Sequence, residues 1–170
     1  MVPVIAFVGP SGSGKTQLIT QLIVALKARG YRVGAIKHTH HDFELDREGK
    51  DSFKMKQVGA SSVLIASAQK IAFIKETQKE LKPQELVERY FEDVDVVLAE
   101  GFSQSEAPKI FVSNSASVQV DKFKPIIALV TDDPKMQTSA QGIPVFARDE
   151  IEKLADFLEG ILVLRNEELL

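Results

Sequence analysis

Residues 9–16 constrain the fold more than any other stretch of this chain. They read Gly-Pro-Ser-Gly-Ser-Gly-Lys-Thr and match the phosphate-binding pattern G-x-x-x-x-G-K-[ST] in full. A short apolar run, 4–9, precedes the pattern, and a segment with helical spacing of apolar residues, 16–30, follows it and ends at Gly30. This order predicts a buried strand, a loop and an amphipathic helix, which is the setting in which the pattern binds phosphate.

The rest of the chain alternates between strand-like and helix-like segments. Strands are expected at 4–9, 31–37, 61–67, 70–76, 94–101, 109–113, 124–130 and 143–146, and helices at 16–30, 49–60, 83–91 and 148–162, the last with Asp149 as N-cap. This alternation predicts an α/β fold of the P-loop NTPase type, with a mostly parallel sheet flanked by helices. The segments 61–76 and 109–120 leave no room for helical crossovers, so we expect short antiparallel or edge additions there.

Composition narrows the class of protein. The 170 residues suit a single domain, 1–170, and the absence of cysteine excludes disulfides, thiolate metal sites and thiol catalysis. A net charge of −3 is not that of a protein that binds duplex nucleic acid. The N-terminal stretch does not resemble a signal peptide, and no apolar run is long enough to span a membrane, so a cytoplasmic protein is expected.

The chemistry of the loop predicts binding of a nucleoside triphosphate with Mg²⁺. Glycines allow backbone conformations that direct successive N–H groups toward an anion, the Lys15 ammonium reaches the β- and γ-phosphates, and the Thr16 hydroxyl binds Mg²⁺. The expected nucleotide-binding residues are Gly9, Pro10, Ser11, Gly12, Ser13, Gly14, Lys15, Thr16 and Gln17. Glu100, at the end of the strand 94–101, is the expected acidic partner of the metal, bound directly or through water. Most P-loop proteins have aspartate at this position. The alternative interpretation is that Glu100 is an ordinary acidic residue at a strand end, without a role in metal binding.

Several stretches together resemble one family. They are "VGPSGSGKTQLITQL", "RVGAIKHTHHDFELDREGKDS", "VGA" at 58–60, "VLAEGF" at 97–102, and "PKIFV" at 108–112. Their combination resembles the MobB family of molybdopterin-guanine dinucleotide biosynthesis, over about residues 4–132. The resemblance implies a homodimeric P-loop adaptor that binds GTP and Mg²⁺ and is at most a slow GTPase. It also implies a partner, the MobA-type guanylyltransferase of molybdenum cofactor biosynthesis, which joins GMP to molybdopterin.

The loop 38–51 follows the second predicted strand and is therefore expected beside the phosphates. Lys37, His38, Asp46, Lys50 and Asp51 fit the family's motif. Asp46 or Asp51 is a candidate Mg²⁺ partner through water, and Lys37 and Lys50 are candidates for a second phosphate-bearing ligand such as molybdopterin. Three interpretations remain open: a solvated charged turn, a transition-metal site of His38, His40 and His41, or a switch loop facing the nucleotide or the pterin.

Recognition of guanine is harder to locate, because the N-K-x-D pattern of GTPases is absent. Asp132, in "VTDDP" at 130–134, is the candidate for the guanine contact, and Asp133 is the reserve.

A small-molecule P-loop kinase and a nickel-type metallochaperone GTPase are the alternative functions. Kinases of that kind usually carry an arginine-rich lid, whereas the arginines here are scattered. Slow hydrolysis is expected, because no arginine close to the P-loop motif in the sequence could act as a finger in cis. A homodimer is also expected, because the apolar residues of the segments 61–76 and 109–120 exceed what one small sheet face can cover. They are Val63, Leu64, Ile65, Ile71, Phe73, Ile110 and Phe111.

Overall fold

The computed structural model describes residues 1–39, 41–43, 46–115, 120–139 and 142–167. The chain forms two compact units, one made of residues 1–38 and 82–170 and the other of residues 39–81. The single domain expected from the sequence stays a prediction. In the part of the chain that the structure describes, no helix has the length and apolar character needed to cross a membrane.

The first unit is built on a six-stranded sheet whose paired strands are all parallel. Its spatial order is β2-β5-β1-β6-β7-β8. The strands are β1 (Val4–Val8), β2 (Val33–Lys37), β5 (Val96–Glu100), β6 (Lys109–Val112), β7 (Ile126–Val130) and β8 (Val145–Phe146). The expected α/β fold with a mostly parallel sheet is therefore confirmed.

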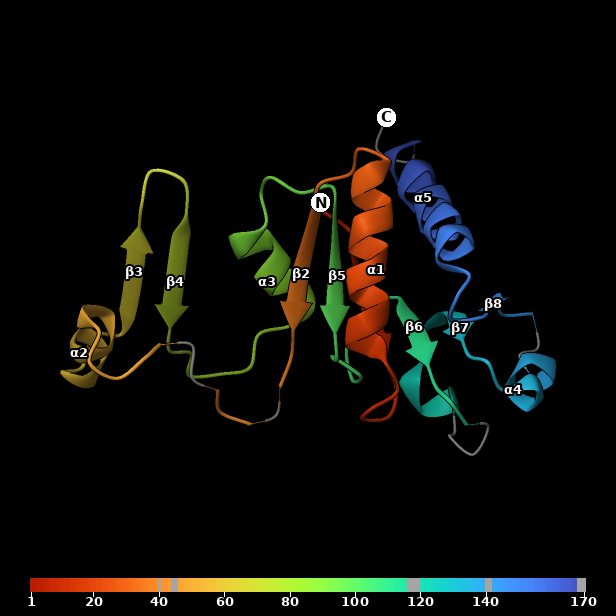
Figure 1. The fold of residues 1–170 in the computed structure, drawn as a ribbon, viewed down its shortest axis with the longest axis horizontal. Helices are drawn as coiled ribbons and strands as arrows, with labels where there is room; N and C mark the ends of the chain where they lie inside the picture. Colours follow the sequence, from red (N-terminus) through yellow and green to blue (C-terminus); the bar gives the residue numbers. More distant parts are fainter. Residues whose placement is uncertain (40, 44–45, 116–119, 140–141, 168–170) are drawn as a thin grey trace. The chain divides into compact units, whose positions relative to one another are not determined.

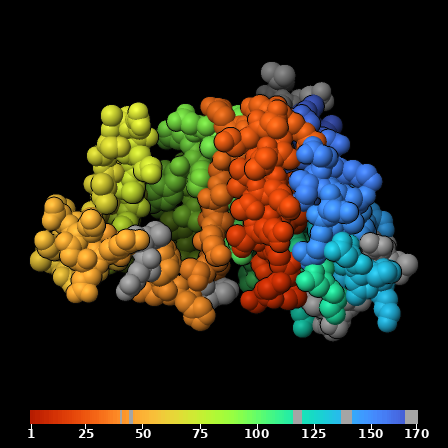
Figure 2. All heavy atoms as spheres, viewed as in Figure 1, coloured from red at the N-terminus to blue at the C-terminus, as the bar shows by residue number. Residues whose placement is uncertain are grey.

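Helices cover both faces of this sheet, because the side chains of the central strands are apolar on both sides. All five residues of β1 are buried, with Ile5 and Phe7 on one face and Val4, Ala6 and Val8 on the other. Helices α1 (Lys15–Ala28) and α5 (Ile151–Glu167) lie side by side over the first face (Figures 1 and 2). Helices α3 (Pro83–Tyr90) and α4 (Pro134–Ser139) supply Val87 and Met136 to the core of the second face.

The position of β6 corrects one expectation. The segment 109–120 was expected as an antiparallel or edge addition, but β6 is a central parallel strand between β1 and β7. The chain crosses from β5 to β6 without a helix, and Phe102 and Ala107 of the connection are themselves buried against the second face. A short coil with apolar side chains thus takes the place of the usual crossover helix. A 3-10 turn, Val120–Phe123, precedes β7.

Two smaller differences concern the C-terminal part. Helix α4 was not predicted, since "VTDDP" indicated a loop. Helix α5 begins at Ile151, so Asp149 is not its N-cap. The Glu150 carboxylate instead accepts a hydrogen bond from the Ala147 backbone N–H at 2.9 Å.

The second unit contains helix α2 (Asp51–Gln57) and the strands β3 (Ser62–Ala66) and β4 (Ile71–Lys75). The two strands pair in antiparallel register, Leu64 opposite Phe73 and Ala66 opposite Ile71. The expectation of an antiparallel addition at 61–76 is confirmed.

Candidate functional site

The loop after β1 has the backbone conformation that its glycines predict. Gly9, Gly12 and Gly14 have φ angles of 140°, 71° and 84°. A Cβ atom at Gly9 would lie 2.1 Å from the Val112 carbonyl oxygen, so only glycine fits where the loop passes the end of β6. The loop leads directly into α1, whose N-terminal end carries partial positive charge. Loop and helix together form a site suited to phosphate.

Lys15, the first residue of α1, folds its side chain back over this loop. Its Nζ donates hydrogen bonds to the carbonyl oxygens of Gly9 at 3.1 Å and Pro10 at 2.7 Å, and lies 3.5 Å from the Ser13 Oγ. Burial lowers the pKa of Lys15 below its ordinary value and the nearby Lys37 acts in the same direction, while Glu100 opposes them. A phosphate bound in the loop would supply an anionic partner to this partly buried ammonium.

The predicted acidic partner of the loop lies next to it. The Thr16 hydroxyl donates a hydrogen bond of 2.6 Å to Glu100 Oε2, and Lys37 Nζ lies 3.7 Å from the same oxygen. Parallel pairing sets this geometry, because Glu100 on β5 is in register with Phe7 on β1 and Lys37 on β2. A hydroxyl and a carboxylate are the hard oxygen ligands that Mg²⁺ prefers. These two residues therefore fit a magnesium ion.

His38 packs against the turn that follows Glu100. Gly101 and Phe102 have φ angles of 99° and 57°, and the His38 ring lies on the Phe102 ring with their centroids 4.5 Å apart. The His38 backbone N–H donates to the Glu100 carbonyl oxygen at 2.9 Å. A Cβ atom at Gly101 would come within 3.0 Å of the His38 Cβ, so glycine suits this turn. His38 thus helps to fix the strand end that carries Glu100.

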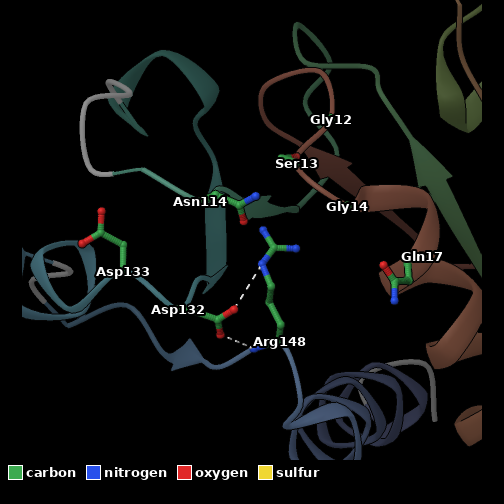
Figure 3. A pocket seen from close by; sticks show the side chains of 8 residues that line it. All are labelled: Gly12, Ser13, Gly14, Gln17, Asn114, Asp132, Asp133 and Arg148. Atoms are coloured by element: carbon green, nitrogen blue, oxygen red, sulfur yellow. Dashed lines mark hydrogen bonds and ion pairs between the residues drawn. The ribbon is translucent and has the colours of Figure 1, made fainter.

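On the other side of β1, the loop borders a pocket of ≈ 580 Å³. Figure 3 shows its lining residues, which come from the P-loop, the start of α1 and the segments after β6, β7 and β8: Gly12, Ser13, Gly14, Gln17, Asn114, Asp132, Asp133 and Arg148. Asp132, expected as the guanine contact, lies in this pocket with its side chain 60% exposed. Its Oδ1 accepts a hydrogen bond of 3.0 Å from the Arg148 backbone N–H, and its Oδ2 lies 3.5 Å from Arg148 Nε.

Arg148 and Asn114 were missed in the sequence. No arginine lies near the P-loop in the sequence, but the fold brings Arg148 beside it: Arg148 Nη1 lies 2.6 Å from the position that a Cβ atom at Gly14 would occupy. The sequence alone could not reveal this approach, because it depends on β8 pairing parallel to β7, which brings the residues after Phe146 to the same edge as the P-loop. Asn114 was missed because its strand, β6, was expected at an edge.

The remaining loop candidates belong to the second unit, apart from Lys37 and His38. Asp46 Oδ1 accepts a hydrogen bond from the Arg47 backbone N–H at 2.9 Å, Lys50 is the N-cap residue of α2, and the Asp51 carboxylate lies 3.5 Å from Lys54 Nζ. Their roles toward phosphate, metal or pterin stay predictions. His40 lies outside the described residues, and within the residues described no three His, Cys, Asp or Glu side chains form a metal-binding group.

Comparison with known proteins identifies the family. The family model "MobB: Molybdopterin guanine dinucleotide synthesis protein B" matches residues 4–132. The chain is 38% identical to the molybdopterin-guanine dinucleotide biosynthesis adapter protein of Escherichia coli K12, covering 93% of this chain and 92% of that protein. It is 35% identical to the adapter protein of the same name from Haemophilus influenzae, covering 95% and 90%. A crystal structure of molybdopterin-guanine biosynthesis protein B matches with a TM-score of 0.75 and 34% identity, over 93% of this chain and 99% of that one.

These matches confirm the resemblance seen in the sequence and do not favour the kinase or metallochaperone alternatives. The family model covers more than half of the chain and includes the P-loop, the histidine loop, Glu100 and Asp132. The chain therefore belongs to the MobB family, molybdopterin guanine dinucleotide synthesis protein B.

Proposed function

We propose that this protein is a GTP-binding adapter of molybdopterin-guanine dinucleotide biosynthesis. The observation that carries the proposal is the geometry of the loop 9–16. Its glycine conformations, the Lys15 ammonium held over it and the hydrogen bond from Thr16 to Glu100 together support binding of phosphate and magnesium at one place. The two curated relatives at 38% and 35% identity are named as adapter proteins of this biosynthesis.

In this proposal each residue of the site has a distinct task. The loop amides and Lys15 bind the β- and γ-phosphates, and Thr16 and Glu100 hold Mg²⁺, which neutralises phosphate charge when it is bound. Asp132 accepts hydrogen bonds from N1 and N2 of guanine, so GTP binds more tightly than ATP.

An adapter implies a partner enzyme, and we assign the MobA-type guanylyltransferase that attaches GMP to molybdopterin. The decisive experiment is a pull-down of the guanylyltransferase by the tagged chain, with and without GTP and Mg²⁺. We expect GTP-dependent capture by the wild type and its loss in Lys15→Ala, with Lys27→Ala on the exposed end of α1 as matched control. Capture of no guanylyltransferase by the wild type would contradict the adapter assignment. Mass spectrometry of the captured complex tests whether molybdopterin binds directly.

We also propose that the protein is a homodimer, with the β3–β4 hairpin as its contact surface. One face of this hairpin carries the cross-strand pairs Leu64–Phe73 and Ala66–Ile71, and Leu64, Phe73 and Ile71 are 56%, 44% and 69% exposed. A two-stranded hairpin is marginally stable alone, and its edges favour pairing with another strand. Ile110 and Phe111, also expected at this surface, are fully buried in β6 and take no part.

The dimer is tested by light scattering at micromolar concentration. We expect a mass of twice 18.8 kDa for the wild type and a shift toward 18.8 kDa for Ile71→Lys, which places a charge on the apolar face. Val58→Lys, at an 87% exposed position after α2, is the control and should leave the mass unchanged. A wild type that is monomeric in this range would contradict the proposal.

A further inference from the structure

We propose that Arg148 is a nucleotide-binding residue whose guanidinium donates to the phosphate adjacent to the nucleoside, the α-phosphate of GTP. The inference rests on the proposed binding of GTP at the P-loop and adds a residue that lies far from the loop in the sequence. It also divides the pocket into a part that reads the base, at Asp132, and a part that binds phosphate, at Arg148.

The first observation is the position of the guanidinium. Arg148 follows β8 and reaches from there toward the P-loop, as Figure 3 shows. Its Nη1 lies so close to Gly14 that a Cβ atom there would be only 2.6 Å away. Gly14 is the N-cap residue of α1, so the cation lies beside the helix end and the loop that bind phosphate. A positive side chain at this place adds to the attraction for an anion.

The second observation is a donor that has no acceptor. Arg148 Nη2 is buried, and no hydrogen-bond partner for it is found among the residues that the structure describes. Buried N–H groups are normally paired, and a cationic donor is the most costly to leave unpaired. A non-bridging phosphate oxygen in the pocket would satisfy this group with a charge-assisted hydrogen bond.

The third observation is how Asp132 holds the arginine. It accepts a hydrogen bond of 3.0 Å from the Arg148 backbone N–H and lies 3.5 Å from Nε, which leaves Nη1 and Nη2 on the side of the P-loop. The Asp132 side chain is 60% exposed, so its outer edge stays accessible to a base. A guanidinium fork held along one edge and open along the other suits an oxyanion.

The order of strands in the sheet favours the α-phosphate over the terminal one. Glu100 and its partner Thr16 lie on the β5 side of the loop, where the metal and the terminal phosphates are proposed to bind. Arg148, Asp132 and Asn114 follow strands on the opposite side of β1 and line the pocket together with Gln17. A nucleotide that spans both sides therefore presents its α-phosphate, between the base and the P-loop, to Arg148.

The test is calorimetric titration of the full chain with GTP and with ATP, each with Mg²⁺. For Arg148→Gln we expect a loss of about 10- to 100-fold in affinity for both nucleotides by the same factor, as for other hydrogen bonds to charged groups. The ratio of GTP to ATP affinity should stay at the wild-type value, because the base contact is at Asp132. Asp132→Asn should change that ratio. Arg89→Gln, which removes the same charge from an exposed position on α3, should bind both nucleotides as the wild type does.

Two results would overturn the inference alone: unchanged affinity of Arg148→Gln, or a loss confined to GTP, which would make Arg148 a base-reading residue. If the wild type bound neither nucleotide, the proposed function would fail together with the inference. Should Arg148→Gln prove unstable in thermal melting, Arg148→Lys replaces it. The proposal expects that variant, which keeps the charge but not the planar fork, to lose affinity for both nucleotides by one common factor.

Discussion

The Thr16 hydroxyl donates a 2.6 Å hydrogen bond to Glu100 Oε2, which joins the first turn of α1 to the end of β5. The two residues come from opposite halves of the sequence and meet because β1 and β5 are parallel neighbours. Both are oxygen ligands of the kind that Mg²⁺ prefers. We therefore expect the binding of metal and the binding of nucleotide to depend on each other at Thr16 and Glu100.

Glu100→Gln should weaken the effect of Mg²⁺ on GTP binding. The amide keeps the size of the side chain but removes its charge, so we expect the apparent Mg²⁺ affinity in the presence of GTP to fall about 10- to 100-fold. The measurement is a calorimetric titration of Mg²⁺ into a mixture of protein and GTP. Glu92→Gln, an exposed acid after α3, is the charge-matched control. An unchanged Mg²⁺ dependence would leave Glu100 with a structural role only.

The affinity for GTP should fall as the pH rises through the lowered pKa of Lys15. Burial lowers this pKa in the free protein, and bound phosphate raises it again, so GTP binding takes up a proton wherever the free lysine is neutral. Below the lowered pKa, Lys15 is charged in both states and contributes no pH dependence. Since Lys37 also lowers the Lys15 pKa, Lys37→Met should move the fall in affinity to higher pH. The test is to measure the dissociation constant of GTP for the wild type and for Lys37→Met across the alkaline pH range. If the affinities of the two proteins fell with the same pH midpoint, the result would contradict this expectation.

Gly9→Ala should destabilise the fold as well as the site. The new methyl group would lie 2.1 Å from the Val112 carbonyl oxygen, at a φ of 140° that side chains rarely adopt. The combined overpacking and backbone strain is roughly 3 kcal/mol of unfolding free energy. Gly30→Ala, also at positive φ but with no atom within 4 Å of the added Cβ, should cost only about 1 kcal/mol. Urea denaturation of both variants measures the difference, and equal losses would argue against the close approach.

Basal GTP hydrolysis should be slow, with a turnover below about 1 s⁻¹, the low end for enzymes. Arg148 is paired with Asp132 on the side of β6, β7 and β8, whereas the terminal phosphate is proposed to bind on the side of Glu100. It is therefore not placed as an arginine finger for that phosphate. A phosphate-release assay with purified protein and no partner tests this, and a faster turnover would favour an enzyme over an adapter.

The parts of the site that local sequence encodes were predictable. The loop 9–16, the strand before it and the helix after it are contiguous, and each carries its own signal in glycine spacing or apolar periodicity. The position of Glu100 beside the loop was also predictable, because an acid at the end of a buried apolar run indicates the edge at which parallel strands open, while its role toward metal stays a prediction. Its hydrogen bond with Thr16 confirms that the two residues come together.

The parts that depend on long-range pairing were not predictable. β6 was misplaced because strands joined without a helix are usually hairpins or edges, whereas here Phe102 and Ala107 cover the sheet in place of a helix. Arg148 was missed because its approach to Gly14 depends on β8 pairing with β7, and that two-residue strand carries little periodic signal. The sequence could place neither until the order of the strands was known.

Calorimetric titration of Mg²⁺-GTP into the wild type and Lys15→Ala shows whether loop 9–16 binds GTP through Lys15. Lys15 Nζ now donates to the carbonyl oxygens of Gly9 and Pro10, and we expect it to donate to phosphate when GTP binds. We expect saturable binding to the wild type and no measurable binding to Lys15→Ala, with both proteins equally folded by circular dichroism. Equal affinity of the two proteins for GTP would contradict it.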